Sequence, residues 1–204
     1  MKRALTGGFI ISGKPGCQVQ KADLLIEDGK IAAIGNIDRT GAEVMDCTGK
    51  YIMPGLINMH AHLFGTGMPS KALGGGGSQK AVLKFVHTPL GQKVLDSMVA
   101  SHVLAEFDSG VTTLRAVGDF CGSDLRIRDG VRVGEKLGPR MYCSGTAITV
   151  PGGHGDGTFA ETASDPAELR ALVDAHHAAG SDFIKICVTG GVMDAKKKGS
   201  PGEL

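Results

Sequence analysis

The sequence is poor in aromatic residues. Its 204 residues include no tryptophan, two tyrosines and seven phenylalanines. Proteins that bind single-stranded nucleic acid stack bases on such rings, so this scarcity argues against that class of function. An excess of one charge is also missing, because 22 lysines and arginines face 21 acidic residues, for a net charge of +1. We therefore expect no nucleic acid and no anionic membrane as a partner.

The sequence also lacks paired cysteine motifs. Its five cysteines are odd in number and scattered, and no C-x-x-C occurs. A disulfide framework or a structural zinc knot is therefore not expected, and a reducing cytoplasm is the expected location. The basic first residues are not followed by a long apolar run, and no stretch of 18 apolar residues occurs. We expect neither a signal peptide nor a membrane span.

Hydrophobic residues make up 42% of the chain, which is enough for a core, and the 32 glycines predict many tight turns. Residues 1–52 predict a small β-rich unit, with strands at 4–11, 22–27 and 30–35. Asp28-Gly29 between the last two has the chemistry of a two-residue hairpin. Such a unit is too small to be stable alone, so we expect it to pack on another domain.

Residues 53–204 predict a second domain in which strands and helices alternate. The predicted strands are 56–63, 111–117, 139–150 and 182–190, and the predicted helices are 88–108, 123–137 and 165–179. This alternation predicts βαβ units and a parallel sheet. The third helix has Asp165 as N-cap and Pro166 in its first turn. Residues 64–78, with four consecutive glycines, predict a loop that is either a lid or a plain connector.

Two histidines close the first strand of this domain. His60 and His62 are one residue apart, and side chains alternate along a strand, so both should project from one face with Asn58 beside them. Two imidazoles at a strand end form half of a divalent metal site. An H-x-H pair alone is a weak signal, so its meaning depends on the rest of the chain.

Lys185 lies inside the apolar fourth strand. A lysine buried in a sheet covered on both faces is costly unless its pKa falls or it is paired. A neutral amine reacts with CO₂ to give a carbamate, whose two oxygens can bridge two metals. The alternative is a lysine whose head group reaches solvent at the strand end. The histidine pair in the same predicted sheet favours the carbamate.

These residues carry a resemblance to a known family. Residues 54–62, Pro-Gly-Leu-Ile-Asn-Met-His-Ala-His, resemble the signature of the amidohydrolase superfamily. The stretches 110–115, 144–155 and 182–193 are similar to its imidazolonepropionase-like and Xaa-Pro or Xaa-Arg dipeptidase branch. The four matches occur in the expected order and cover essentially the whole chain.

The resemblance implies an α/β fold, the first half of a (β/α)₈ barrel preceded by a small β-sandwich unit, with the active site at the carboxyl ends of the strands. It implies that His60 and His62 bind metal and that carboxylated Lys185 bridges two Zn²⁺ ions. His154 follows the third strand and is predicted to contact the substrate or transition state, or else to be structural. Arg115 is predicted to bind a substrate carboxylate or to form a strand-end salt bridge.

The sequence departs from the family in places. Relatives take two further histidine ligands from the fifth and sixth strands and an aspartate from the eighth, whereas this sequence ends after the fourth. Ala116 stands where many relatives have aspartate. Four other histidines lie on or beside predicted helices and are expected to be surface or packing residues. They are His87, His102, His176 and His177.

Three functions remain open from the sequence. The first is a metal-dependent amidohydrolase that uses a metal-activated hydroxide on a dipeptide, an N-acyl amino acid or a cyclic amide, with these residues alone inactive. The second is a truncated or split non-catalytic relative that binds a partner chain or serves as a scaffold. The third, a mononuclear deaminase, is disfavoured by Lys185. The expected partners are a small-molecule amide or dipeptide, and either further copies of the chain or the missing C-terminal half.

Overall fold

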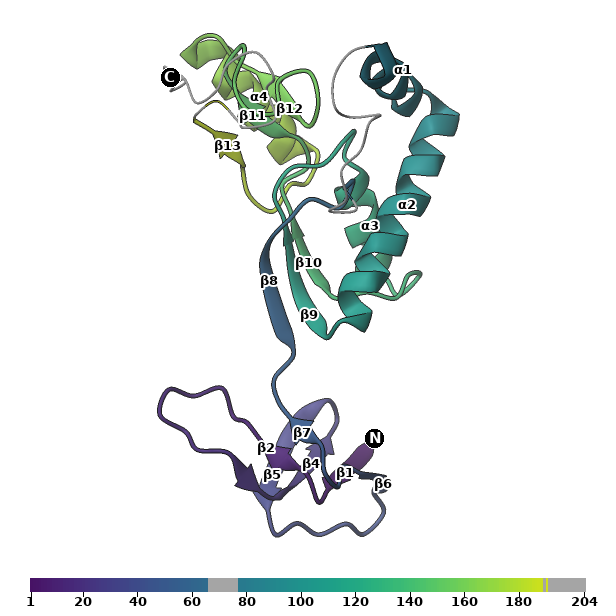
Figure 1. The fold of residues 1–204 in the computed structure, drawn as a ribbon, viewed down its shortest axis with the longest axis vertical. Coiled ribbons are helices and arrows are strands. Elements are labelled where there is room, and N and C mark those ends of the chain that lie inside the picture. Colours follow the sequence, from purple (N-terminus) through teal and green to yellow (C-terminus); the bar gives the residue numbers. More distant parts are fainter. Residues whose placement is uncertain (66–76, 189, 191–204) are drawn as a thin grey trace. The chain divides into compact units, whose positions relative to one another are not determined.

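The computed structural model describes residues 1–65, 77–188 and 190 (Figure 1). The chain divides into two compact units, Met1–Gly55 and Leu56–Leu204. No helix among the described residues is long and apolar enough to cross a membrane.

Unit 1 contains two small sheets, in the strand orders β5-β4-β1-β6 and β3-β2-β7. Its strands are β1 (Lys2–Thr6), β2 (Phe9–Ile10), β3 (Gln20–Lys21), β4 (Asp23–Glu27), β5 (Lys30–Gly35), β6 (Glu43–Asp46) and β7 (Tyr51–Ile52). Glu27 pairs with Lys30, and Asp28 and Gly29 between them have φ of 49° and 75°. This is the two-residue hairpin that the sequence predicts, because such turns need positive φ at both central positions.

The predicted strand 4–11 is wrong as a single element. β1 ends at Thr6 and β2 begins at Phe9, because Gly7 between them adopts a φ of +73°. A side chain at Gly7 would also come within 2.7 Å of the Thr48 hydroxyl oxygen. The glycine therefore allows the chain to leave one sheet and enter the other.

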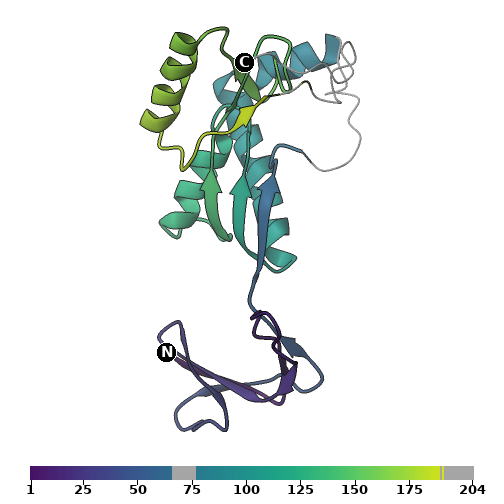
Figure 2. The ribbon, with the colours of Figure 1, turned by 90° about the vertical axis from the view of Figure 1, so that its left-hand side faces the viewer.

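Unit 2 contains two parallel sheets, in the orders β10-β9-β8 and β12-β11-β13. Its strands are β8 (Leu56–Ala61), β9 (Val111–Ala116), β10 (Arg140–Cys143), β11 (Ala147–Thr149), β12 (Ala160–Thr162) and β13 (Ile186–Cys187). Its helices are α1 (Gly77–Val86), α2 (Pro89–Asp108), α3 (Ser123–Arg132) and α4 (Pro166–Ala178). The predicted α/β alternation is confirmed, and Figure 2 shows β8, β9 and β10 side by side with helices behind them.

Local capping sets two of these helices. The Thr88 hydroxyl accepts a hydrogen bond from the Gly91 amide (3.1 Å) at the start of α2. The Asp165 carboxylate accepts from the amides of Ala167 (2.8 Å) and Glu168 (2.9 Å) at the start of α4. Both side chains satisfy amides that have no partner within the helix, so the predicted beginnings hold to within a residue.

Other predicted bounds need correction. The predicted loop 64–78 is helical from Gly77, where α1 begins, and its residues 66–76 lie outside the described part of the chain. The predicted strand 139–150 is interrupted near Gly145, which has a φ of +69°. α3 ends at Arg132, because Gly134 (φ +79°) turns the chain before the predicted end. The fourth strand is limited to Ile186–Cys187.

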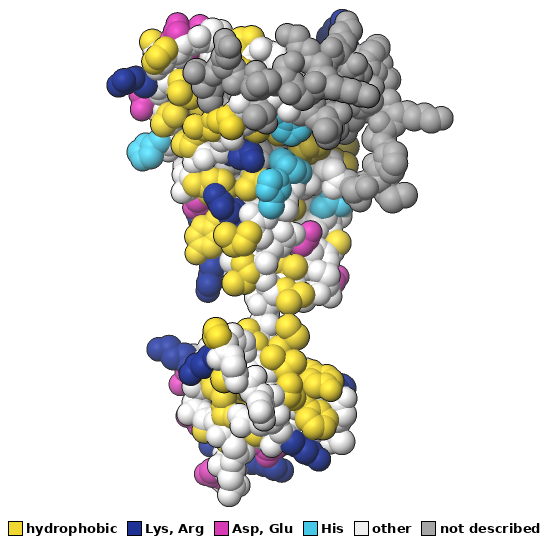
Figure 3. Space-filling model, turned by 60° about the vertical axis from the view of Figure 1, so that its left-hand side comes forward, with side chains coloured by type: hydrophobic (Ala, Val, Ile, Leu, Met, Phe, Trp, Pro, Cys, Tyr) yellow, Lys and Arg dark blue, Asp and Glu magenta, His cyan; other side chains and the backbone are white. Residues whose placement is uncertain are grey.

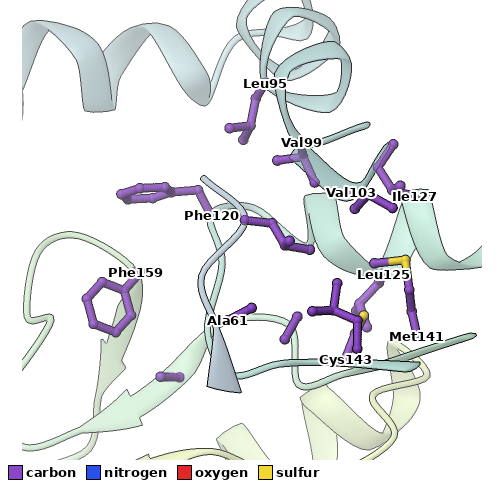
Figure 4. Packing of buried hydrophobic residues seen from close by; sticks show 14 of the residues in the cluster. Ala61, Leu95, Val99, Val103, Phe120, Leu125, Ile127, Met141, Cys143 and Phe159 are labelled. Carbon is purple, nitrogen blue, oxygen red and sulfur yellow. The ribbon is translucent and has the colours of Figure 1, made fainter. Parts of the chain in front are cut away.

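The core of unit 2 lies between the β8–β9–β10 sheet and the helices α2 and α3 (Figures 1 and 4). It includes Val99, Val103, Leu114, Ile127 and Met141, each at most 2% exposed. The opposite face of this sheet carries exposed apolar side chains. Ile57 is 63% exposed and Tyr142 is 45% exposed. Parallel sheets are usually covered on both faces, so one face lacks its cover within the described residues.

Candidate metal centre

The candidate site begins at a bulge in β8. Asn58 pairs with Leu114 and Ala61 pairs with Ala116, so two residues of β8 face one residue of β9 between these pairs. The bulge breaks strict alternation. Asn58 therefore does not share the histidine face as predicted: its side-chain amide donates to the Glu106 carboxylate of α2 (3.1 Å).

The rings of His60 and His62 nevertheless lie together. Their centroids are 5.3 Å apart and their planes meet at 68°. His62 Nδ1 lies 2.8 Å from the Gly118 carbonyl oxygen, which can only accept, so Nδ1 carries the proton. Nε2 is then the unprotonated nitrogen with a lone pair for a metal ion. A backbone carbonyl on the second nitrogen is the usual way in which proteins fix a ligating imidazole.

Burial lowers the pKa of His62, and the hydrogen bond to Gly118 opposes this effect. Smaller lowering contributions come from the charges of His60, Lys185 and His154. In Figure 3, histidine side chains gather on one face of unit 2 next to lysine or arginine side chains. A lowered pKa keeps His62 neutral at pH 7, as a metal ligand must be.

The end of β8 is fixed by the end of β9. The Val117 amide donates to the Ala61 carbonyl oxygen (3.0 Å). The Asp119 carboxylate accepts from the amides of Leu63 (3.2 Å) and Phe64 (2.8 Å). Asp119 is fully buried, and desolvation raises its pKa well above the ordinary value, with the Asp124 charge adding to the effect. Asp119 was not identified from the sequence, because an aspartate in a turn carries no local sign of burial.

Lys185 directly precedes β13. Its carbonyl oxygen accepts from the Ile148 amide (2.8 Å), so its backbone belongs to the ladder between β11 and β13. The side chain is partly exposed rather than buried as predicted. The prediction assumed a sheet covered on both faces, and that cover is incomplete within the described residues. The charge of Lys185 still makes a small contribution to the lowered pKa of His62.

His154 shares the aromatic neighbour Phe159 with His62, whereas Arg115 contacts a different ring. His154 follows β11 in a turn, and its ring packs edge-to-face on Phe159 with centroids 5.2 Å apart. Arg115 lies on β9 with its guanidinium carbon 4.3 Å from the centre of the Phe183 ring, a cation–π contact. His154 therefore joins the histidine pair, whereas Arg115 is placed by an aromatic contact that the sequence did not indicate.

A pocket of about 440 Å³ opens beside the histidine pair on the side of α2. Its lining includes His60, His62, His102, Asn58 and Glu106.

The predicted role of the four helical histidines as surface or packing residues agrees with their contacts. His87 Nδ1 donates to the Leu83 carbonyl oxygen (2.7 Å), His102 Nδ1 to the Leu63 carbonyl oxygen (2.6 Å), His176 Nε2 lies 2.9 Å from Glu161, and His177 is exposed.

The described residues fit part of a divalent metal site. Among them, no three His, Cys, Asp or Glu side chains are grouped to hold a metal ion. The donors that lie together are instead the imidazoles of His60 and His62, with ring centroids 5.3 Å apart. An imidazole pair with one nitrogen already fixed is a donor set typical of zinc and related ions.

The sequence profile of the amidohydrolase family matches residues 51–202. The chain belongs to the amidohydrolase family. The match includes the histidine pair, Lys185 and all the described strands of unit 2. Among curated proteins, the D-hydantoinase of Geobacillus stearothermophilus is 48% identical over 64 residues, which cover 31% of this chain and 13% of that protein. The dihydroorotase of Caldanaerobacter subterraneus subsp. tengcongensis is 32% identical over 118 residues, covering 57% and 27%.

Solved amidohydrolase structures have the same fold. A Xaa-Pro dipeptidase with bound methionine in the active site is similar with a TM-score of 0.81 and 29% identity, over 100% of this chain and 51% of that one. The ochratoxinase of A. niger, at 21% identity and a TM-score of 0.76, shows the likeness of fold alone over 98% and 50%. The chain thus spans about half the length of these structures. The described elements form three consecutive β/α units and a further parallel strand, β13, as in the predicted partial barrel preceded by a small β unit.

Proposed function

We propose that the protein is a metal-dependent hydrolase of amide-type C–N bonds, with His60, His62 and Lys185 in its metal centre. One observation carries the proposal. His62 is held as the Nδ1–H tautomer by Gly118, and the His60 ring centroid lies 5.3 Å from its own. This arrangement leaves Nε2 of a neutral imidazole without a hydrogen bond to Gly118 and beside a second imidazole at one end of a parallel sheet. Family membership supports the same chemistry.

Lys185 has two forms that suit a metal centre. Its neutral amine can add CO₂, forming an N–C bond and releasing one proton, to give a carbamate whose single negative charge is shared by two oxygens. In that form it supplies charge that the two imidazoles lack. The partial exposure of Lys185 leaves it accessible to dissolved CO₂. We propose two Zn²⁺ ions, which His60, His62 and carboxylated Lys185 would hold.

Bound zinc would polarise a scissile carbonyl and activate water near neutral pH. The residues of this chain have separate tasks. Gly118 orients His62 and Asp119 holds the end of β8. We propose that His154 donates a hydrogen bond to a substrate oxygen. Water adds to the carbonyl carbon, the C–N bond breaks, and the amine leaves with a proton while the acid is released as a carboxylate.

We propose as substrates a dipeptide or an N-acyl amino acid, with a cyclic amide as a further possibility. The similar structure named a Xaa-Pro dipeptidase supports the first class, and the similarity to a hydantoinase and a dihydroorotase supports the last. Arg115 is the proposed contact for a substrate carboxylate. We also propose that the uncovered face near Ile57 and Tyr142 packs against further polypeptide, either the remainder of a barrel or another copy.

The test starts from metal-free protein in CO₂-depleted buffer. Zinc is added with and without bicarbonate, and metal content is measured beside hydrolysis of Xaa-Pro dipeptides, N-acetyl amino acids and hydantoin. We expect about two zinc ions per chain and activity only with bicarbonate. Lys185→Gln should lose the bicarbonate dependence and most of the activity, whereas the exposed Lys93→Gln should change neither. Folded protein that takes up no metal under any condition would overturn the proposal.

A further inference from the structure

One buried aromatic ring contacts both a candidate metal ligand and the candidate substrate histidine. The Phe159 ring centroid lies 5.1 Å from that of His62 and 5.2 Å from that of His154. It also stacks on Phe64 at 5.6 Å, with an interplanar angle of 26°. Phe159 is 5% exposed, so its ring acts through packing rather than by touching substrate. It therefore lies between two histidines from different elements.

The backbone around Phe159 is shaped for this ring. The Phe159 carbonyl oxygen accepts from the Ala147 amide (2.9 Å), which fixes the residue to the start of β11. Side chains at Gly118 and Gly155 would come within 3.1 Å and 2.9 Å of the ring, and both glycines have positive φ (122° and 82°). A side chain at either position would therefore displace the ring.

Gly118 connects this packing to the metal ligand. Its carbonyl oxygen accepts the hydrogen bond from His62 Nδ1, and its α-carbon faces Phe159. The same ring thus confines the plane of the His62 imidazole and the residue that sets its tautomer. It also confines the turn that carries His154. A shift of the ring would move both histidines together.

We infer that Phe159 is a positioning residue that fixes His62 for metal binding and holds His154 against the same site. The inference rests on the proposed function for its metal, whereas the packing itself does not depend on metal. Residues that orient a metal-ligating histidine typically change metal affinity about 10- to 100-fold when altered. We expect Phe159→Leu to weaken zinc binding about 10-fold, because the shorter side chain leaves the His62 ring free to rotate.

Phe120 provides a matched control. It is 6% exposed and belongs to the same buried cluster as Phe159 (Figure 4). Its ring packs edge-to-face on that of Phe64, with centroids 4.6 Å apart. Its aromatic contacts among the described residues do not include a histidine. Phe120→Leu removes a comparable ring from the same core, so it should lower stability similarly without changing zinc affinity. The difference between the two variants isolates positioning from general loss of packing.

The experiment uses the complete protein that carries this chain. Zinc dissociation constants are measured by competition with a chelating dye, and ¹⁵N imidazole shifts of the metal-free protein report the His62 tautomer. We expect Phe159→Leu to weaken zinc binding about 10-fold and to average the two ring-nitrogen shifts. Phe120→Leu should match the wild type in both readouts.

Equal zinc affinity and equal ¹⁵N shifts in both variants would overturn the inference while leaving the metal proposal intact. If the wild type binds no zinc, the proposed function fails, and the tautomer comparison still decides the role of Phe159. Should Phe159→Leu fail to fold, the pair Phe159→Met and Phe120→Met repeats the comparison, because methionine fills irregular space with less loss of volume.

Discussion

Candidate metal ligands lie at the end of β8 and immediately before β13, but the structure holds these two strands differently. β8 has six residues, pairs along β9, and has its end fixed by the Val117 amide and the Asp119 carboxylate. β13 has two residues and pairs with β11. Among the described residues, Lys185 makes no side-chain hydrogen bond, whereas His62 makes one to Gly118. A hydrogen bond thus already holds the His62 ring, whereas none holds the Lys185 side chain within the described residues.

The largest effect is expected at β8, where a hydrogen bond already holds the His62 ring. His62→Ala removes the imidazole whose Nε2 is free for metal, so zinc affinity should fall by more than about 100-fold, beyond the range for orienting residues. The measurement is zinc content after dialysis against a chelator of known affinity. His177→Ala, an exposed histidine on α4, is the matched control and should keep wild-type zinc content. Retention of full affinity by His62→Ala would remove β8 from the site.

The next effect concerns the carboxylate that holds the end of β8. Asp119→Asn leaves one acceptor oxygen where the carboxylate accepts from the Leu63 and Phe64 amides. A buried donor left without a partner costs about 1–3 kcal/mol, so the free energy of unfolding should fall by that amount. Urea denaturation checks this, with exposed Asp174→Asn as the control. An unchanged unfolding midpoint would show that β8 does not depend on Asp119.

Asp119→Asn should also change how the free energy of unfolding depends on pH. Burial raises the pKa of Asp119 above its ordinary value of 3.8, so the folded state binds this proton more readily than the unfolded state. Its contribution to stability is therefore present below pH 3.8 and is lost as pH rises toward the raised pKa. Asp119→Asn cannot titrate and should show a flatter dependence of unfolding free energy over that interval. A slope equal to that of the wild type would contradict the raised pKa.

The parts of the fold that the sequence predicted are those set by local chemistry. Asp28-Gly29 specifies its hairpin, and Thr88 and Asp165 specify their helix starts, because each acts on backbone groups within a few residues. The features that the sequence did not predict depend on residues that are far apart in the sequence. The β8 bulge depends on its register with β9, and the break at Gly7 depends on two separate sheets.

The residues of the candidate site also divide into those with a local signal in the sequence and those without one. His60 and His62 were found because their spacing is local, and Lys185 because charge in an apolar strand is unusual. Phe159 and Asp119 gave no local signal, since their roles arise from contacts with β8, which is remote in sequence. Burial of Lys185 was overestimated, because the prediction assumed a cover that the described residues do not supply.

A smaller loss of stability is expected from a change in α4, the helix that leads to β13. α4 precedes β13, and its N-terminus is capped by Asp165. Asp165→Ala should lower the free energy of unfolding by about 1 kcal/mol, because two helix amides lose their acceptor. Thermal unfolding followed by circular dichroism measures the change, and Asp165→Ser, which keeps a cap, should recover most of it. If contacts at the end of β8, rather than those near β13, hold the candidate ligands in place, Asp165→Ala should weaken zinc binding less than Asp119→Asn does.

The smallest expected effect asks whether α2 side chains help to hold β8. Glu106 accepts a hydrogen bond from the Asn58 side chain at 3.1 Å, in a partly exposed position. Glu106→Gln keeps an acceptor but loses its charge, so stability should fall by only about 0.5 kcal/mol. Exposed Glu135→Gln is the control, and zinc affinity is measured for both. If Glu106→Gln destabilises the protein as much as Asp119→Asn does, α2 holds β8 as firmly as β9. Contacts with α2 would then hold the histidine pair in place as much as contacts with β9 do.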